Sequence, residues 1–298
     1  MKRSFVSMVV VAAALTSFGC AGRTAEWEKE DASPADAASD ASDVAAQSDM
    51  DLANAAWAQR TDPAKIQEAI AGWEKVVAKD PKNKEALVML TRAHYFWGDG
   101  YLRGDEDKYL EVLDKGVKWG EKALVASAPE FDKAMRDGGK FHESIKLIGQ
   151  EAVPAAYWYA TSLGKWAKRK SFAVLLGQKD NIKATMERVM ELDEDYYYAG
   201  PHRYFGAMYA IAPGFAGGDI DLSVKHYGIC VEKQPQFLGT KVLKAENYAT
   251  KVDDEEMFKQ LLTEVLEGDP KAIPEIEPEQ LVEQAKAKEL MAQIDDLF

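Results

Sequence analysis

The chain has 298 residues, of which 47% are hydrophobic, so it can bury a large core in one or two domains. Its formal charge of −13 comes from the two ends: residues 21–51 carry nine acids and two bases, residues 253–298 carry fourteen and four, and residues 52–252 are nearly neutral with 27 and 29. An acidic chain with a neutral body lacks the basic surface that a phosphate backbone requires, so nucleic acid is excluded as an expected partner.

The first twenty residues have the layout of an export signal. Two basic residues precede an apolar run that is too short to cross a bilayer permanently, and small residues lead up to Cys20. This cysteine resembles the acylated residue of the bacterial lipobox, although Ser17 and Phe18 depart from the usual pattern. We therefore expect a lipoprotein-type signal peptide over 1–20 and a lipid anchor on Cys20. Ordinary secretion with cleavage near Ala21 is the alternative.

Residues 21–51 are rich in Ala, Asp, Ser and Glu, and Trp27 is almost the only large apolar side chain among them. Such a segment buries too little surface to fold, and its like charges extend it. We predict a disordered acidic tether over 21–51, a folded domain over 52–298, and a periplasmic protein held at a membrane. Ala21 and Gly22 lack the Asp signal for the inner membrane, which slightly favours the outer one. Cys230 is the only other cysteine, so acylation of Cys20 leaves no disulfide within the chain.

From residue 52 onward the apolar residues follow helical spacing and no strand period is clear, which predicts an all-α body. A repeat of small, large and small residues, closed by proline or Glu194, matches the second helix of a tetratricopeptide repeat. It recurs at Ala69, Trp73, Val76 and Pro81; Ile182, Met186, Val189 and Glu194; Ser223, Tyr227, Cys230 and Pro235; and Phe258, Leu262, Val265 and Pro270. Leu163-Gly164 and Phe205-Gly206 fit first helices, in which the glycine lets two helices approach closely.

The repeat ends are unevenly spaced, which predicts a tetratricopeptide-like helix-pair solenoid with insertions. The insertions fall around 98–108, 131–140, 168–179 and 213–221, and in a solenoid such additions often gather on the binding face. The segment from Pro274 is expected to form a closing amphipathic helix whose apolar residues are Leu281, Ala285, Leu290, Ile294 and Phe298.

Five segments in order resemble the T component associated with TRAP transporters, the TatT family. They are Tyr157-Trp158-Tyr159-Ala160, Leu163-Gly164-Lys165-Trp166-Ala167, the run 192–198 (LDEDYYY), the run 200–206 (GPHRYFG) and Gly217-Gly218-Asp219. The resemblance implies a periplasmic lipoprotein with a tetratricopeptide-like fold that works with the solute-binding (P) subunit of a TRAP transporter. It also implies a concave surface or central channel for a small, hydrophobic ligand. No catalytic residues come with it.

Two aromatic clusters supply the candidate ligand contacts. Trp158 shares a helical face with Trp166 and is expected in the core, whereas Tyr157 and Tyr159 point elsewhere. Tyr157, Tyr159 and Trp166 are candidates for lining a cleft, and simple packing is the alternative. Tyr197 is a candidate from the second cluster.

A turn at 199–201 is followed by a predicted helix whose first turn holds His202 and Arg203. A helix start with such donors suits an anionic head group, which makes both residues candidates. The alternative is that Arg203 pairs with a nearby aspartate and only fixes the loop. Asp219, in the glycine loop, is a further candidate, with capping of the next helix as its default role.

No motif indicates catalysis, a cofactor or a metal. The four histidines lack metal-ligand spacing, and Cys230 occupies a packing position. We therefore expect no enzyme, and a lipid-anchored accessory protein of solute uptake that binds the P subunit and a small hydrophobic or anionic ligand. An envelope scaffold that binds only proteins is the alternative. The oligomeric state stays open, with a homo-oligomer among the options.

Overall fold

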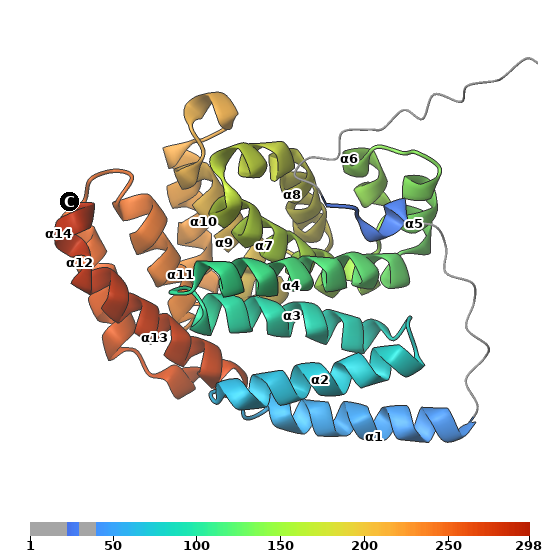
Figure 1. The fold of residues 1–298 in the computed structure, drawn as a ribbon. Coiled ribbons are helices and arrows are strands. Elements are labelled where there is room, and N and C mark those ends of the chain that lie inside the picture. Colours follow the sequence, from blue (N-terminus) through green and yellow to red (C-terminus); the bar gives the residue numbers. More distant parts are fainter. Residues whose placement is uncertain (1–22, 30–39) are drawn as a thin grey trace, which may run out of the picture.

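The computed structural model describes residues 23–29 and 40–298, and every regular element in these two ranges is a helix (Figure 1). The all-α prediction is confirmed for this part of the chain. The α-helices are α1 (Asp40–Trp57), α2 (Pro63–Lys79), α3 (Lys84–Tyr101), α4 (Glu106–Ser127), α5 (Pro129–Arg136), α6 (Phe141–Ser144), α7 (Val153–Lys170), α8 (Phe172–Leu192), α9 (Tyr196–Ile211), α10 (Ile220–Lys233), α11 (Leu238–Leu243), α12 (Glu255–Glu267), α13 (Glu277–Ala292) and α14 (Ile294–Leu297). A short π-helical segment, Lys244–Ala249, continues α11. None of the described helices is long and apolar enough to cross a membrane.

Most long helices pack against the next one in sequence, as α1 does with α2, α3 with α4, α7 with α8 and α9 with α10 (Figure 1). Side-chain caps start these helices, because an oxygen before the first turn accepts a free backbone N–H. Asp62 caps α2, Asn83 caps α3, Asp105 caps α4 and Ser171 caps α8. Each tight turn therefore ends one helix and begins its neighbour.

The small-large-small positions predicted for second helices all face the interior. In α2, α8, α10 and α12 each of these twelve side chains is at most 1% exposed. Gly206 lies so close to the Tyr227 ring that a Cβ there would sit 2.9 Å from it, which confirms a close approach of α9 and α10. The same prediction for Gly164 is wrong, because a Cβ at Gly164 would meet nothing within 4 Å.

The body begins earlier than the predicted boundary at residue 52. Helix α1 starts at Asp40, and Met50 and Ala53 on it are buried. Residues 23–29 also lie against the body, with Trp27 only 7% exposed (Figure 1, blue segment beside α5). The predicted tether therefore does not extend over 23–29 and 40–51, since these ranges form 3-10 and α-helical structure and Trp27 and Met50 in them are buried against the body. The signal segment 1–20 and Cys20 lie outside the described residues.

Helix α7 is buried on nearly every side. It packs against α3, α4, α8 and α9, and Tyr157, Trp158 and Tyr159 are all under 5% exposed. A helix in such a position needs apolar residues around its whole circumference. For this reason the three consecutive aromatic residues can all be buried.

The C-terminal helix α13 returns to the first helices through a buried ionic cluster. Glu279 accepts hydrogen bonds from Arg60 at 2.7 Å and from Arg92 at 2.8 Å, and Arg60 also donates to the Glu275 carbonyl at 2.6 Å. The predicted segment is helical, and Leu290, Ile294 and Phe298 pack on apolar neighbours as expected, but the prediction is wrong for Leu281 and Ala285, which are exposed. Leu281 is 39% exposed, whereas the polar residues Glu279, Gln280 and Lys286 are buried.

Removal of the Glu279 carboxylate is expected to destabilise the protein strongly. The Glu279→Ala variant would leave the buried guanidinium of Arg60 and the half-buried one of Arg92 without their anion, and such losses cost about 3–5 kcal/mol. Glu289→Ala on the same helix removes an exposed partner of Arg103 and should change the unfolding free energy by less than about 1 kcal/mol. Urea unfolding of both variants checks this, and equal effects would contradict the role of the cluster.

Candidate functional site

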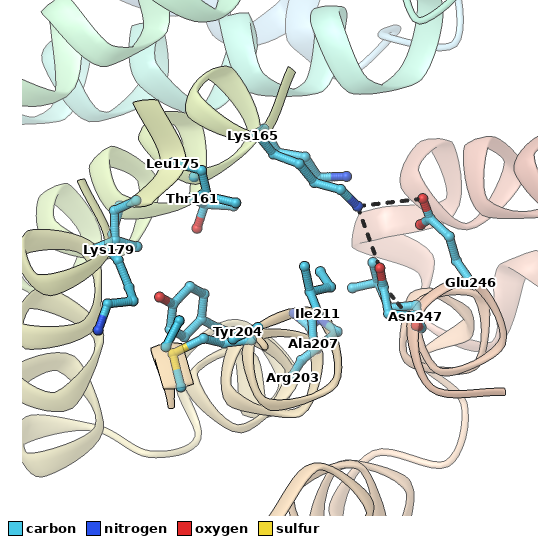
Figure 2. Close-up of a pocket in the computed structure, with 18 of the residues that line it drawn as sticks. Thr161, Lys165, Leu175, Lys179, Arg203, Tyr204, Ala207, Ile211, Glu246 and Asn247 are labelled. Atoms are coloured by element: carbon cyan, nitrogen blue, oxygen red, sulfur yellow. Dashed lines mark hydrogen bonds and ion pairs between the residues drawn. The ribbon is translucent and has the colours of Figure 1, made fainter. Parts of the chain in front are cut away.

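A cavity of about 200 Å³ lies between α7, α8, α9 and the π-helical segment 244–249. Figure 2 shows Lys179 and Tyr204 on one side of it and Glu246 and Asn247 on the other. Most of the lining is apolar; it includes Ala160, Leu175, Leu176, Ile182, Ala207, Met208, Ile211, Pro213, Ala216 and Leu243. The cavity can therefore take a small molecule with a hydrocarbon body.

One stripe of α7 forms the inner wall of the cavity. The residues on it follow the spacing of a single helical face; they are Tyr157, Ala160, Thr161, Gly164, Lys165 and Lys168. Gly164 and Ala160 leave the space that larger side chains fill elsewhere on this helix. The open surroundings of Gly164 are thus a property of the cavity.

Three lysines and an arginine give the lining its positive charge. Lys168 lies 4.0 Å from the Glu246 carboxylate and 3.5 Å from the Asn247 carbonyl oxygen. Lys179 is 29% exposed and pairs with its neighbour Asp180 at 3.0 Å. With only Glu246 as an acid among the lining residues, the site is net cationic.

Lys165 is tied to an acid outside the cavity. Its ammonium group donates to Asp99 at 2.7 Å, and Lys286 of α13 binds the same carboxylate. Burial opposes the charged form of Lys165, but Asp99, Tyr95, Tyr109 and Glu246 together outweigh it, and the pKa of the lysine lies well above its ordinary value. For Asp99, burial alone would raise the pKa. Lys165 and Lys286 together lower it by more than burial raises it, so the pKa lies far below its ordinary range.

The floor of the cavity depends on an unusual turn at the start of α9. Tyr197, Tyr198 and Ala199 have φ values of 48°, 59° and 57°, a left-handed conformation that L-residues seldom adopt in succession. Arg203 donates to the carbonyl of Tyr198 at 2.8 Å and to that of Tyr197 at 2.9 Å. Its guanidinium therefore fixes the turn from inside the following helix.

Two further contacts fix the position of Arg203. The guanidinium lies over the Phe237 ring at 4.1 Å and donates to the Tyr157 hydroxyl at 3.3 Å. Gly200 is pressed against the Tyr157 ring, because a Cβ there would lie 2.6 Å from it. Tyr157 and Arg203 thus close one end of the cavity together.

The structure places two of the seven predicted site residues in the cavity lining and the other five outside it. Tyr157 and Arg203 line the cavity. Tyr159 and Trp166 lie outside its lining, where Tyr159 packs on Trp27 and Trp166 lies under Arg23, and Tyr197 packs on Trp158 and Phe237.

The remaining two candidates also lie away from the cavity. His202 contacts His226 at 2.9 Å between their Nδ1 atoms and lies 3.3 Å from Glu194. Burial and the neighbouring His202 lower the pKa of His226 to about 4. Asp219 caps α10 by accepting the Leu222 N–H at 3.0 Å, as its default role predicts. No cluster of described residues has the composition of a metal site.

Sequence reasoning missed the lysines and the apolar residues of α8. The insertions predicted at 168–179 and 213–221 were the available signal, since Lys168, Phe172, Leu176, Lys179 and Ala216 all line the cavity. These insertions are not loops throughout, because 172–179 forms the first two turns of α8.

Exposed apolar side chains surround the entrance. Phe172 is 57% exposed, Leu176 41%, Ile211 37% and Phe215 83%. The first three also line the cavity, and Phe215 lies in the loop between α9 and α10. Such a patch is typical of a surface that contacts a partner or a ligand.

A sequence model of the family described as TRAP transporter T-component matches residues 47–298. The chain belongs to the TRAP transporter T-component family. No protein in a search of curated proteins matches it. Membership makes this chain an accessory component of a TRAP transporter system, and the matched region contains the whole cavity.

Replacement of Arg203 is expected to destabilise this T-component by about 2–4 kcal/mol, since two carbonyls of a strained turn lose their buried donor. Arg203→Lys should recover only part of this loss, because an ammonium group cannot reproduce the planar guanidinium that serves both carbonyls. Thermal and urea unfolding measure the effect, with the exposed Lys225→Ala as a control. An Arg203→Ala variant as stable as this control would show that the turn holds without the arginine.

Proposed function

We propose that this T-component is a periplasmic lipoprotein, anchored through Cys20, that binds an amphipathic anion in the cavity and passes it to the solute-binding subunit of a TRAP transporter. Its helix pairs form a tetratricopeptide-like solenoid in this proposal. The cavity is the observation that supports it best, because it combines an apolar body, cationic groups and an exposed apolar entrance. A scaffold that binds only proteins has no need of such an interior.

The ligand lies with its hydrocarbon part between α7 and α9 and its charged end at one of two lysines, either Lys168 beside Glu246 and Asn247 or Lys179 on the opposite side of the cavity. Lys165 and Arg203 already have close partners in Asp99 and in the carbonyls of Tyr197 and Tyr198. The other two lysines contact weaker or more exposed partners, at 4.0 Å from Glu246 and 3.0 Å from Asp180. They can exchange these for a ligand carboxylate at little cost.

Filling the cavity should abolish ligand binding without unfolding the protein. Ala207→Trp places a large ring in the cavity, and we expect at least about a tenfold weaker affinity for decanoate by calorimetry. Ala55→Trp, on the exposed side of α1, is the matched control and should bind as the parent does. Lys168→Met and Lys179→Met should weaken binding of decanoate more than that of decanol. Decanoate binding that survives Ala207→Trp would place the ligand elsewhere.

Partner binding is tested on the exposed apolar entrance. Phe215→Asp removes the most exposed large apolar residue without touching the cavity lining, so we expect loss of the solute-binding subunit in membrane copurification and unchanged decanoate affinity. Leu52→Asp, which is 66% exposed on α1, is the control and should retain the subunit. Failure of the parent to recover the subunit under any ligand condition would contradict the transport role, whereas equal recovery by both variants would place the contact elsewhere.

A further inference from the structure

The segment 23–29 is held against the body by the side chain of Trp27. Its ring contacts Phe131 at 5.3 Å, Phe141 at 5.6 Å and Tyr159 at 6.1 Å, measured between ring centroids. These rings come from α5, α6 and α7, so the segment joins three helices that are separate in the chain. A tryptophan buried in this way anchors the backbone on both sides of it.

Arg23 and Lys29 fix the two ends of the segment. Arg23 forms ion pairs with Asp114 and with Glu121, the latter at 3.0 Å, and lies over the Trp166 ring at 5.3 Å. Burial raises the pKa of Glu121 to about 7, and the arginine acts in the opposite direction. The Arg136 guanidinium donates to the Lys29 carbonyl at 2.6 Å. The ends are therefore attached to α4 and α5.

We propose that residues 23–29 are a latch that holds the α4–α5 side of the body against a phospholipid surface. The proposal rests on the lipid anchor at Cys20, which is part of the function proposed above, and not on the transport role. Arg23 follows Cys20 by three residues, so a docked latch keeps Arg23 within about 10 Å of the anchor. With the latch released, the next described residue is Asp40, and the twenty residues from Cys20 to Asp40 can span at most about 70 Å.

The outer side of α4 has the chemistry of a membrane-facing surface. Lys115 and Lys118 are 51% and 55% exposed and lie between Asp114 and Glu121 in the sequence, where Lys115 pairs with Glu111 at 2.7 Å and Lys118 with Asp114 at 2.6 Å. The Lys122 ammonium lies over the Trp119 ring at 4.6 Å. Lysines beside tryptophan suit the head-group region of a bilayer that contains anionic lipid. This surface and the short link to Cys20 point to the same side of the body.

Energy transfer from the protein to the bilayer tests the orientation. The lipidated chain is reconstituted in vesicles of phosphatidylethanolamine and phosphatidylglycerol that contain an acceptor lipid, with a donor dye on Glu111→Cys of α4 or on Asp295→Cys of α14. Figure 1 places α14 at the end of the molecule away from the blue segment. We expect transfer at least about twofold more efficient from position 111. Equal efficiencies from the two positions would overturn the proposal.

Two changes separate the latch from the anchor. Trp27→Ala should remove the difference between the two dye positions and make cleavage within residues 23–39 at least about tenfold faster in limited proteolysis. Ten Gly/Ser residues inserted between Gly22 and Arg23 should also remove the dye difference, while leaving the segment protected from the protease because its contacts are intact. A Trp27→Ala protein that keeps both the dye difference and the protection would show that the segment is no latch.

The matched controls test the lipid anchor and the transport role separately from the latch. Leu52→Ala changes an exposed apolar residue outside the latch and should behave as the parent in both measurements. The Cys20→Ala protein should no longer bind to the vesicles. If it still binds, Cys20 is not the anchor, and the proposal fails because it depends on that anchor. Decanoate and subunit binding should be unchanged in Trp27→Ala, which keeps this test independent of the transport role.

Discussion

The burial of α7 among four other helices is the constraint on which the rest of the structure depends. Helices α3, α4, α8 and α9 all pack on it, so each part of its circumference must match a different neighbour. Trp158 packs on Tyr95 of α3, and Tyr159 packs on Trp27 and against Gly120 of α4. Trp166 lies under Arg23. On the remaining side Ala160 and Gly164 are too small to fill the space, and α8 and α9 close around it. The cavity thus follows from where the small residues lie on one helix.

The same constraint explains why strain is placed at the start of α9. The chain must turn sharply after α8 so that Gly200 can touch the Tyr157 ring, and three left-handed residues make that turn. Left-handed non-glycine residues are unfavourable by about 1–2 kcal/mol each, so the turn needs a compensating interaction. Arg203 supplies it through two carbonyl contacts and a stacked ring. A residue that the sequence suggested as an anion contact is therefore used mainly to shape the cavity wall.

The sequence predicted the parts of the fold that depend on apolar periodicity. Trp73, Met186, Tyr227 and Phe258 are buried as their spacing requires. At Gly206 a Cβ would collide with the Tyr227 ring, so the glycine allows α9 and α10 to pack closely, as predicted. The face of α13 could not be predicted in this way. It buries Glu279, Gln280 and Lys286 because Arg60, Gln236 and Asp99 lie opposite, and those partners are remote in the chain.

The site shows the same limit. Tyr157 and Arg203 were found because aromatic and basic residues cluster around them, and both line the cavity. Lys168 and Lys179 look like ordinary solvated lysines of a helix surface, and only the packing of α8 against α7 brings both of them to the lining of the same cavity. Trp27 is the converse case, since a single ring in an acidic segment gave no sign that Phe131, Phe141 and Tyr159 would surround it.

Charge balance decides where an anion can lie in this cavity. Asp99 is buried between Lys165 and Lys286, and Lys286 also forms an ion pair with Glu283 at 2.8 Å. Two acids and two lysines therefore already neutralise each other behind the α7 side of the cavity. A carboxylate that reached Lys165 would have to compete with Asp99, and a buried acid deprived of its partner is strongly unfavourable. Lys168 and Lys179 face no such penalty. The deep end is therefore left to hydrocarbon and the charge stays at the entrance, next to the exposed side chains of Phe172 and Leu176.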